Sequence, residues 1–246
     1  AALVGEFEKP RFFSYNARIC AHSRSGREGC NRCVDVCSTG AIRADGDHVK
    51  VEPHLCAGCG GCSTVCPSGA MTYAFPKAPE LGARLKSALS TYREAGGKDA
   101  CILFHDAGEG RRGLLELGRR GQGLPARVIP LEVFHVASIG IDMMLGAIAY
   151  GASQVAILST EKVADGYLEA TKKQMGYAGA IVNALGYPGE HFHVLEGAAA
   201  AWQLPGAAGV ANPAAFNLSV DKRTSLDFAI DHLARQAALK TELIAL

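Results

Sequence analysis

The sequence predicts a small α+β unit organised around clustered cysteines, followed by an α/β unit with a parallel sheet. Eight of the nine cysteines lie between Cys20 and Cys66, and that region contains an internal repeat. Beyond it, strand-like apolar runs alternate with segments of helical periodicity, which is typical of a parallel sheet. The expected boundaries are 1–77 for the cysteine-rich unit, 78–97 for a linking helix and 98–246 for the α/β unit with its C-terminal helix.

Composition narrows the class of protein. The 246 residues are 48% hydrophobic, which is enough for a well-buried core. Lys and Arg number 25 against 24 Asp and Glu, so no overall field attracts nucleic acid or an anionic membrane. The most apolar stretch, Ile139–Ile148, is interrupted by Asp142 and is shorter than the about 20 residues that a span requires. We therefore expect no nucleic-acid partner and no membrane span, and no secretory signal is visible.

The cysteines repeat one short unit. Residues 30–42, CNRCVDVCSTGAI, match residues 59–71, CGGCSTVCPSGAM. The second copy extends to Cys56-x2-Cys59-x2-Cys62-x3-Cys66-Pro67. Cysteines at positions i, i+3 and i+6 of a tight loop can point at one iron–sulfur cluster, while the fourth faces away and ligates another. The spacing therefore predicts clusters that exchange a ligand between the two copies.

Two other uses of these cysteines remain open. Disulfide frameworks space their cysteines irregularly across small secreted domains, whereas most gaps here are two or three residues. Eight cysteines could also hold two tetrahedral zinc ions. The repeated spacing, with proline after the last cysteine, favours iron–sulfur clusters over both.

The segment from about Arg18 to Phe75 resembles the two-cluster bacterial ferredoxins. That resemblance implies two 4Fe-4S clusters, the first held by Cys20, Cys30, Cys33 and Cys66, and the second by Cys56, Cys59, Cys62 and Cys37. The chain departs from the family at Ala21–Gly29, which puts nine residues where two are usual. A longer loop is tolerable because closure entropy rises slowly with length. A strand pair is expected over Ala44–Pro53, turning at Asp45-Gly46-Asp47.

The surroundings of the two motifs differ. The second contains the small residues Ala57, Gly58, Gly60 and Gly61, which let backbone amides approach the cluster, whereas Arg32 and Asp35 flank the first. Different solvent exposure predicts two unequal reduction potentials.

The rest of the chain reads as strands and helices in alternation. A helix is expected over Ala78–Ala95, ending at Gly96-Gly97. The expected strands are Ala100–Phe104, Arg127–Leu131, Gln154–Leu158 and His191–Val194. The expected helices are Gly110–Gly121, Gly140–Ala149, Gly166–Leu185 and Thr224–Leu239, the last opened by a capping box at Thr224–Asp227.

This second unit resembles the delta subunit of methyl-viologen-reducing hydrogenase over about Asp99–Glu196. The likeness rests on the order of elements, on Gly151-Ala152 before a strand and on the closing Val194-Leu195-Glu196-Gly197. In that family, cysteines on the loops after the strands hold a 2Fe-2S cluster. The matching loops here contain none: His105-Asp106-Ala107, His135-Val136-Ala137 and Ser159-Thr160-Glu161. The resemblance then implies a docking or scaffolding unit without a third cluster, and Cys101 is expected to be a buried structural residue.

A polar or nucleotide site is the competing interpretation of the α/β unit. The polar residues near the expected strand ends are His105, Asp106, Glu109, Glu132 and His135, at the edge where α/β sheets bind ligands. Gly108–Gly113 also matches GxGxxG, with Glu132 about 20 positions on. The motif does not follow its strand directly, however, and a solvated loop rim is favoured.

The predicted function is electron transfer, as a subunit or accessory of a larger oxidoreductase, with a redox protein such as a dehydrogenase or hydrogenase subunit as partner. Fusion of these two units resembles accessory proteins of molybdenum formate dehydrogenase systems. A cluster-containing enzyme or an assembly factor is the alternative, but no acid–base group or organic cofactor motif stands out, which favours a non-catalytic carrier. Oxygen-labile clusters predict a cytoplasmic location.

Overall fold

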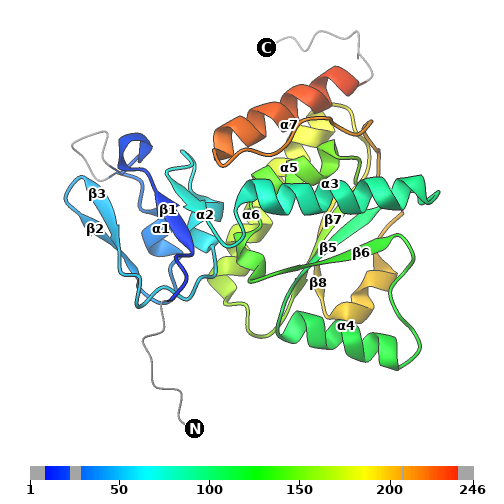
Figure 1. The fold of residues 1–246 in the computed structure, drawn as a ribbon, viewed down its shortest axis with the longest axis horizontal. Coiled ribbons are helices and arrows are strands. Elements are labelled where there is room, and N and C mark those ends of the chain that lie inside the picture. Colours follow the sequence, from blue (N-terminus) through cyan, green and yellow to red (C-terminus); the bar gives the residue numbers. More distant parts are fainter. Residues whose placement is uncertain (1–8, 23–28, 207, 238–246) are drawn as a thin grey trace.

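A computed structural model describes residues 9–22, 29–206 and 208–237, and arranges them in a small N-terminal body beside a larger one (Figure 1). The small body contains two antiparallel strand pairs and short helices. Its elements are β1 (Phe13–Tyr15), η1 (Ala17–Ile19), α1 (Arg32–Asp35), β2 (Ile42–Asp45), β3 (His48–Val51), α2 (Gly61–Val65) and β4 (Met71–Tyr73).

The strand pairs bring distant parts of the small body together. β1 pairs with β4, with Ser14 opposite Thr72, so the two ends of the cysteine-rich segment lie side by side. β2 and β3 form the predicted hairpin, which turns at Gly46 (φ 58°) and Asp47. The expected strand pair over Ala44–Pro53 is therefore confirmed, although β2 begins two residues earlier, at Ile42.

The larger body has the predicted parallel sheet. In the described part of the chain, its four strands follow the order β6-β5-β7-β8, and every neighbouring pair is parallel. Its elements are α3 (Ala78–Glu94), β5 (Cys101–Asp106), α4 (Glu109–Arg119), β6 (Val128–Val133), η2 (Val136–Ser138), α5 (Ile141–Ala149), β7 (Gln154–Ser159), α6 (Asp165–Ala184), β8 (Phe192–Glu196), η3 (Ala198–Gln203) and α7 (Lys222–Gln236). The sequence-based bounds agree with these to within three residues, and the strands run further toward their polar carboxyl ends than their apolar cores indicate.

Alternation along the strands builds a core on each face of the sheet. Ile102 and Phe104 of β5 pack in the main core with residues of α3, α5, α6 and α7. Cys101 and Leu103 point to the opposite core, against residues of α4 and η3. Cys101 is fully buried, as predicted, and burial raises the pKa of its thiol to about 12.

Helix α3 is more than a link between the two units. Leu81, Leu85 and Leu89 recur at helical spacing and belong to the main core of the larger body. The helix ends as predicted, with Gly96 in the left-handed conformation (φ 86°) just beyond it. Residues 78–94 therefore cover one face of the sheet.

The expected capping box at the start of the last helix is wrong. Helix α7 begins at Lys222, and the Asp221 carboxylate caps it by accepting from the Thr224 amide at 2.7 Å. Thr224 therefore lies inside the first turn. Asp and Thr are both good N-cap residues, so residue type alone does not decide between Asp221 and Thr224 as the N-cap of α7. The N-cap is the last residue with extended backbone before the helix, which is Asp221. Residues 238 and 239 of the expected helix lie outside the described residues.

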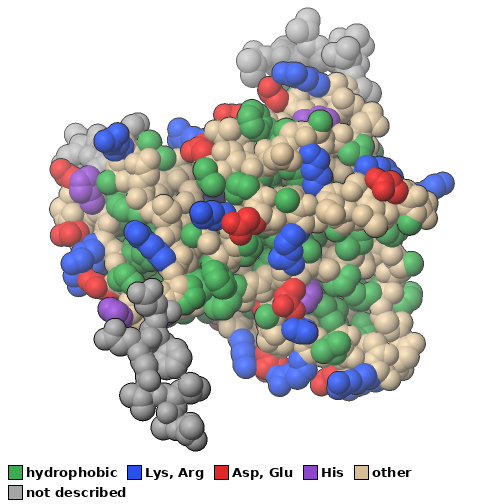
Figure 2. Space-filling view, in the orientation of Figure 1, with side chains coloured by type: hydrophobic (Ala, Val, Ile, Leu, Met, Phe, Trp, Pro, Cys, Tyr) green, Lys and Arg blue, Asp and Glu red, His purple; other side chains and the backbone are tan. Residues whose placement is uncertain are grey.

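The visible surface carries both signs of charge. Figure 2 shows Lys and Arg side chains interspersed with Asp and Glu across both bodies, without one large patch of either sign. None of the described helices combines the length and hydrophobicity needed to cross a membrane.

Candidate functional site

Four of the eight clustered cysteines surround one cavity in the small body. The cavity contains about 410 Å³ of space free of protein atoms, adjoining open solvent included. Its cysteines come from the end of the first motif and from the loop leading into α2: they are Cys37, Cys56, Cys59 and Cys62. This is the set that the sequence assigns to the second cluster. The structure thus places Cys37 of the first motif beside the three cysteines of the second.

The other four cysteines lie close to one another around Cys33 of α1. Burial, reinforced by Cys66, Cys20 and Cys30 nearby, raises the pKa of the Cys33 thiol to about 12. These are the four cysteines that the sequence assigns to the first cluster. Cys20, Cys33 and Cys66 are all buried, with less than a tenth of each exposed.

The two sets are adjacent. The pKa of the Cys62 thiol is raised by burial and then by four cysteines, which are Cys59, Cys33, Cys56 and Cys37. Cys33 of the first set is thus close enough to act on Cys62 of the second. Two clusters at these positions would lie near one another, as a short electron path requires.

The cysteine environment fits iron–sulfur clusters. Burial raises the pKa of the Cys33 and Cys62 thiols, and the neighbouring cysteines add to the effect, so the protein surroundings alone disfavour these two thiolates. Iron supplies the positive charge that deprotonates a ligating thiol outright. Within the described ranges, no group of three or more His, Cys, Asp or Glu side chains converges closely enough to hold a single metal ion.

The insertion after Cys20 is closed at its base. The amide of Cys30 donates to the carbonyl oxygen of Ala21 at 3.5 Å, and His22 Nδ1 lies 3.2 Å from the Cys30 carbonyl oxygen. These contacts return the chain to the first motif, which places Cys20 with Cys33 in one buried group. Residues 23–28 lie outside the described residues.

Several protein groups contact the cysteine sulfurs. The Met71 amide donates to Cys66 Sγ at 3.4 Å, and Thr39 Oγ1 lies 3.6 Å from Cys37 Sγ. Such hydrogen bonds are among the features that set cluster potentials.

A tyrosine hydroxyl bonds to one cysteine of each set. Tyr15 contacts Cys20, and burial together with this hydrogen bond raises the pKa of the Tyr15 hydroxyl to about 12. Tyr167, from the first turn of α6, contacts Cys59, and the pKa of its hydroxyl is raised to about 12 for the same two reasons. Both hydroxyls therefore hold their protons at neutral pH and can donate them to a ligating sulfur.

The glycines before α2 admit side chains from outside the motif. A Cβ on Gly58 would lie 2.6 Å from the Phe12 ring, and one on Gly61 would lie 2.9 Å from the Tyr167 ring. Gly60 (φ 81°) allows equally close contact with Ser138 of η2. The sequence attributes the small residues to amide–cluster contact, whereas here they also allow the larger body to pack against the second motif.

Polar contacts join the two bodies at α2. The Thr64 hydroxyl donates to the Ala137 carbonyl oxygen at 2.6 Å. The Lys222 ammonium group, buried at the start of α7, donates to the carbonyl oxygens of Ser63, Thr64 and Cys66 at 2.9, 2.8 and 3.3 Å. Both contacts lie beside the helix that carries Cys62.

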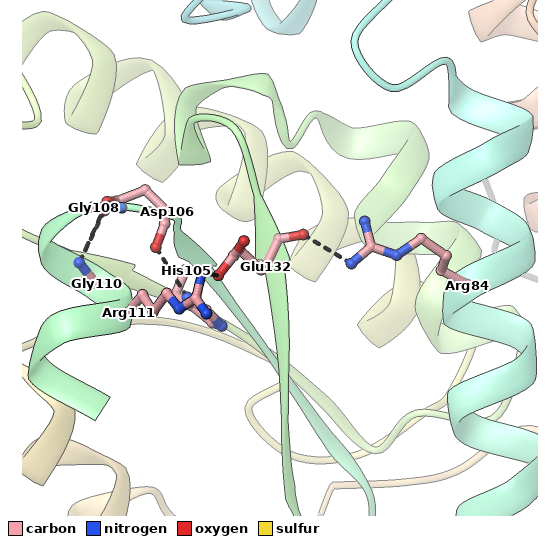
Figure 3. Close-up of polar contacts among 7 residues, drawn as sticks. All are labelled: Arg84, His105, Asp106, Gly108, Gly110, Arg111 and Glu132. Atoms are coloured by element: carbon pink, nitrogen blue, oxygen red, sulfur yellow. Dashed lines mark hydrogen bonds and ion pairs between the residues drawn. The ribbon is translucent and has the colours of Figure 1, made fainter. Parts of the chain in front are cut away.

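The five polar residues at the strand ends do not converge on one site. Glu132 forms an ion pair with Arg111 at 3.7 Å, while its carbonyl oxygen accepts from Arg84 at 3.0 Å (Figure 3). Glu109 pairs instead with Lys162 at 2.8 Å. His135 contacts the Tyr167 ring of α6, with 5.7 Å between centroids. His105 remains at the end of β5.

The GxGxxG match does not form an open phosphate site. Asp106 Oδ1 accepts from the Gly108 amide at 2.7 Å, and both carboxylate oxygens lie 3.3 Å from the Gly110 amide (Figure 3). The amides at the start of α4 are therefore already bonded to a carboxylate of the chain. A nucleotide phosphate would have to displace that carboxylate, which argues against the dinucleotide interpretation.

Comparison with known families supports the cluster assignment. A family described as the 4Fe-4S dicluster domain matches residues 27–70, which supports an iron–sulfur, ferredoxin-like unit in this part of the chain and electron transfer in general. The match spans seven of the eight clustered cysteines and begins after Cys20. No curated protein matches the chain.

Three residues at the site have no signal in the sequence. Tyr15, Tyr167 and Lys222 lie outside the cysteine motifs, and Lys222 is 156 positions beyond Cys66. No local pattern marks them, because their role depends on how the two bodies pack.

Proposed function

We propose that this chain carries electrons through two 4Fe-4S clusters as a subunit or accessory of a larger oxidoreductase. The observation that supports this most strongly is the separation of eight cysteines into two adjacent sets of four. The proposed ligands are Cys20, Cys30, Cys33 and Cys66 for cluster one, and Cys56, Cys59, Cys62 and Cys37 for cluster two. When bound, each cluster would accept and release single electrons.

The residues of the chain prepare the two sites differently. Most ligands of cluster one are buried in the small body, whereas all four ligands of cluster two are half-buried and line a cavity that Tyr167 of the larger body also lines. Solvent exposure and hydrogen bonding tune cluster potentials. The unequal surroundings of the two clusters therefore support two unequal reduction potentials. An electron would then reside mainly on the cluster with the higher potential.

The α/β body is proposed to be the docking and scaffolding part. Its strand-end loops contribute no cysteine, and its polar rim is closed by internal ion pairs. Resemblance to the delta subunit of methyl-viologen-reducing hydrogenase suggests a dehydrogenase or hydrogenase subunit as partner. A molybdenum formate dehydrogenase system in the cytoplasm is the specific assignment that we propose.

The proposal is tested by following electrons through the purified chain. Under anaerobic conditions, the reconstituted protein should bleach when reduced by dithionite and recover its absorbance when a one-electron acceptor such as cytochrome c is added. Repeated cycles without iron loss would support a carrier. Absorbance that never recovers would argue against it.

A second reduction assay tests which enzyme system donates electrons to the chain. Formate with a catalytic amount of a molybdenum formate dehydrogenase should reduce the clusters, whereas formate alone should not. Reduction by hydrogen and a hydrogenase, but not by formate, would move the chain to a hydrogenase system.

A further inference from the structure

We infer that the α/β body sets the reduction potential of cluster two through the Tyr167 hydroxyl, whereas Tyr15 sets that of cluster one from within the small body. This inference rests on the proposed ligand sets. It assigns positioning and tuning roles to two residues outside the cysteine motifs. It also explains why a cluster-free domain packs so tightly against the second motif.

Tyr167 is held firmly at the boundary between the two bodies. Only 5% of its surface is exposed. Its ring lies where a Cβ on Gly61 would be 2.9 Å away, and the His135 ring meets it nearly edge-on, at 79°. Any larger residue at position 61 would push this ring aside. The hydroxyl therefore has a fixed position beside the cavity, and it reaches that position from α6.

The hydrogen bonds of Tyr167 have one consistent direction when Cys59 is a ligand. Tyr167 and Cys59 line the same cavity, and because a ligating thiolate only accepts, the Tyr167 proton points to Cys59 Sγ. The Tyr167 oxygen then accepts from the Ser38 amide at 3.3 Å and from the Ser38 hydroxyl at 2.6 Å. Ser38 follows Cys37, another cluster-two ligand, at the position where the second motif has Pro67. A proline at position 38 would have neither donor.

The direction of the effect follows from charge. Reduction adds one electron to the cluster and increases the negative charge on its sulfurs. A hydroxyl donor stabilises that reduced state more than the oxidised state, and so raises the potential. Because Tyr167 belongs to the larger body, the potential of cluster two depends on how the two bodies are packed.

Tyr15 provides an internal comparison. Its hydroxyl contacts Cys20 and accepts from the Val49 amide at 3.3 Å, so all of its partners lie within the small body. The two tyrosines therefore act on different clusters from different domains. Removing one hydroxyl at a time separates the two effects.

The experiment is an EPR-monitored redox titration of the full chain after anaerobic cluster reconstitution. The variants are Tyr167→Phe, Tyr15→Phe and, as a control, Tyr177→Phe, which removes an exposed hydroxyl from the same helix. Tyr167→Phe should lower the potential of one centre, so that its reduced-to-oxidised ratio at a fixed potential falls about tenfold, equivalent to about 59 mV for a one-electron couple. Tyr15→Phe should lower the other centre. Tyr177→Phe should change neither.

Ser38→Ala gives a second, milder test. It keeps the Tyr167 hydroxyl but removes one of its two donors, so the same centre should shift in the same direction by a smaller factor.

The following results would contradict either the inference or the proposed function. Unchanged potentials in Tyr167→Phe, or equal shifts of both centres, would overturn the inference. Loss of about half the iron in Tyr167→Phe would also overturn it, because the residue would then be needed for assembly and not for tuning. Absence of iron and sulfide from the unmodified chain would instead contradict the proposed function itself.

Discussion

The Lys222 ammonium group lies 2.8 Å from the Thr64 carbonyl oxygen and donates a hydrogen bond to it across the boundary between the two bodies. Helix α2 is short, and of the Ser63 and Thr64 carbonyls near its end only that of Ser63 accepts from a backbone amide, that of Cys66 at 3.4 Å. Lys222 satisfies them with a positive charge, which also complements the helix C-terminus. The start of α7 is thereby fastened to the segment between Cys62 and Cys66.

Replacing this lysine should weaken the whole chain. In Lys222→Met, the buried Thr64 carbonyl oxygen loses the Lys222 donor and the Ser63 carbonyl oxygen keeps only the Cys66 amide, so we expect a loss of about 2 kcal/mol in the free energy of unfolding. Lys173→Met, at an exposed position of α6, should change it by less than about 0.5 kcal/mol. Urea unfolding of the apo-protein provides the measurement. Equal stability of the two variants would show that the buried contact contributes nothing.

Two glycines allow the cost of backbone strain to be distinguished from the cost of a packing clash. Gly40 (φ 62°) and Gly60 (φ 81°) both lie in the left-handed region, where a Cβ costs about 1–2 kcal/mol. A Cβ on Gly40 meets nothing within 4 Å, whereas one on Gly60 would lie 2.5 Å from Ser138 Cβ. Gly60→Ala should therefore destabilise the chain more than Gly40→Ala, as thermal unfolding can measure. Equal losses would mean that the two bodies separate at no cost.

Stability should fall below neutral pH because of buried histidines. Burial lowers the pKa of His135 below 6.5, an effect that nearby Asp106 partly offsets. The folded state then binds fewer protons than the unfolded state, so the contribution is complete above about pH 6.5 and is lost as the pH falls through the lowered pKa. Burial acts on His193 in the same direction.

The matched variants are His135→Gln and His48→Gln, the second at an exposed position of the hairpin. Unfolding measured between pH 8 and pH 5.5 should depend less on pH in His135→Gln, while His48→Gln should follow the unmodified chain. A pH dependence in His135→Gln as steep as that of the unmodified chain would contradict this assignment.

Crossover of ligands between the two motifs is testable with single cysteines. Cys37→Ser lies in the first motif but should remove cluster two, because Cys37 lines the cavity with Cys56, Cys59 and Cys62. Cys20→Ser should remove cluster one. Cys101→Ala, buried far along the chain, should keep all the iron. EPR shows which centre is lost, and loss of the same centre in both serine variants would disprove the crossover.

The sequence is most informative where the chemistry is local. Cysteine spacing reveals the repeated motif, and the resemblance to the two-cluster ferredoxins that the motif carries divides the eight sulfurs into two sets. The parallel sheet follows from the alternation of apolar runs, and α3 from its leucine spacing.

Prediction fails where residues far apart determine the result. Tyr167 and Lys222 look like ordinary helix residues until α6 and α7 are packed against α2. The start of α7 depends on whether Asp221 or Thr224 caps it, and both residue types are suitable.

One measurement tests the central claim most directly: iron and acid-labile sulfide counts on anaerobically prepared protein, joined to EPR after dithionite reduction. Two four-iron clusters predict about eight iron and eight sulfide per chain, with a spectrum of two interacting centres. About half of each would mean that one cysteine set holds no cluster. Zinc without sulfide would contradict the electron-transfer account.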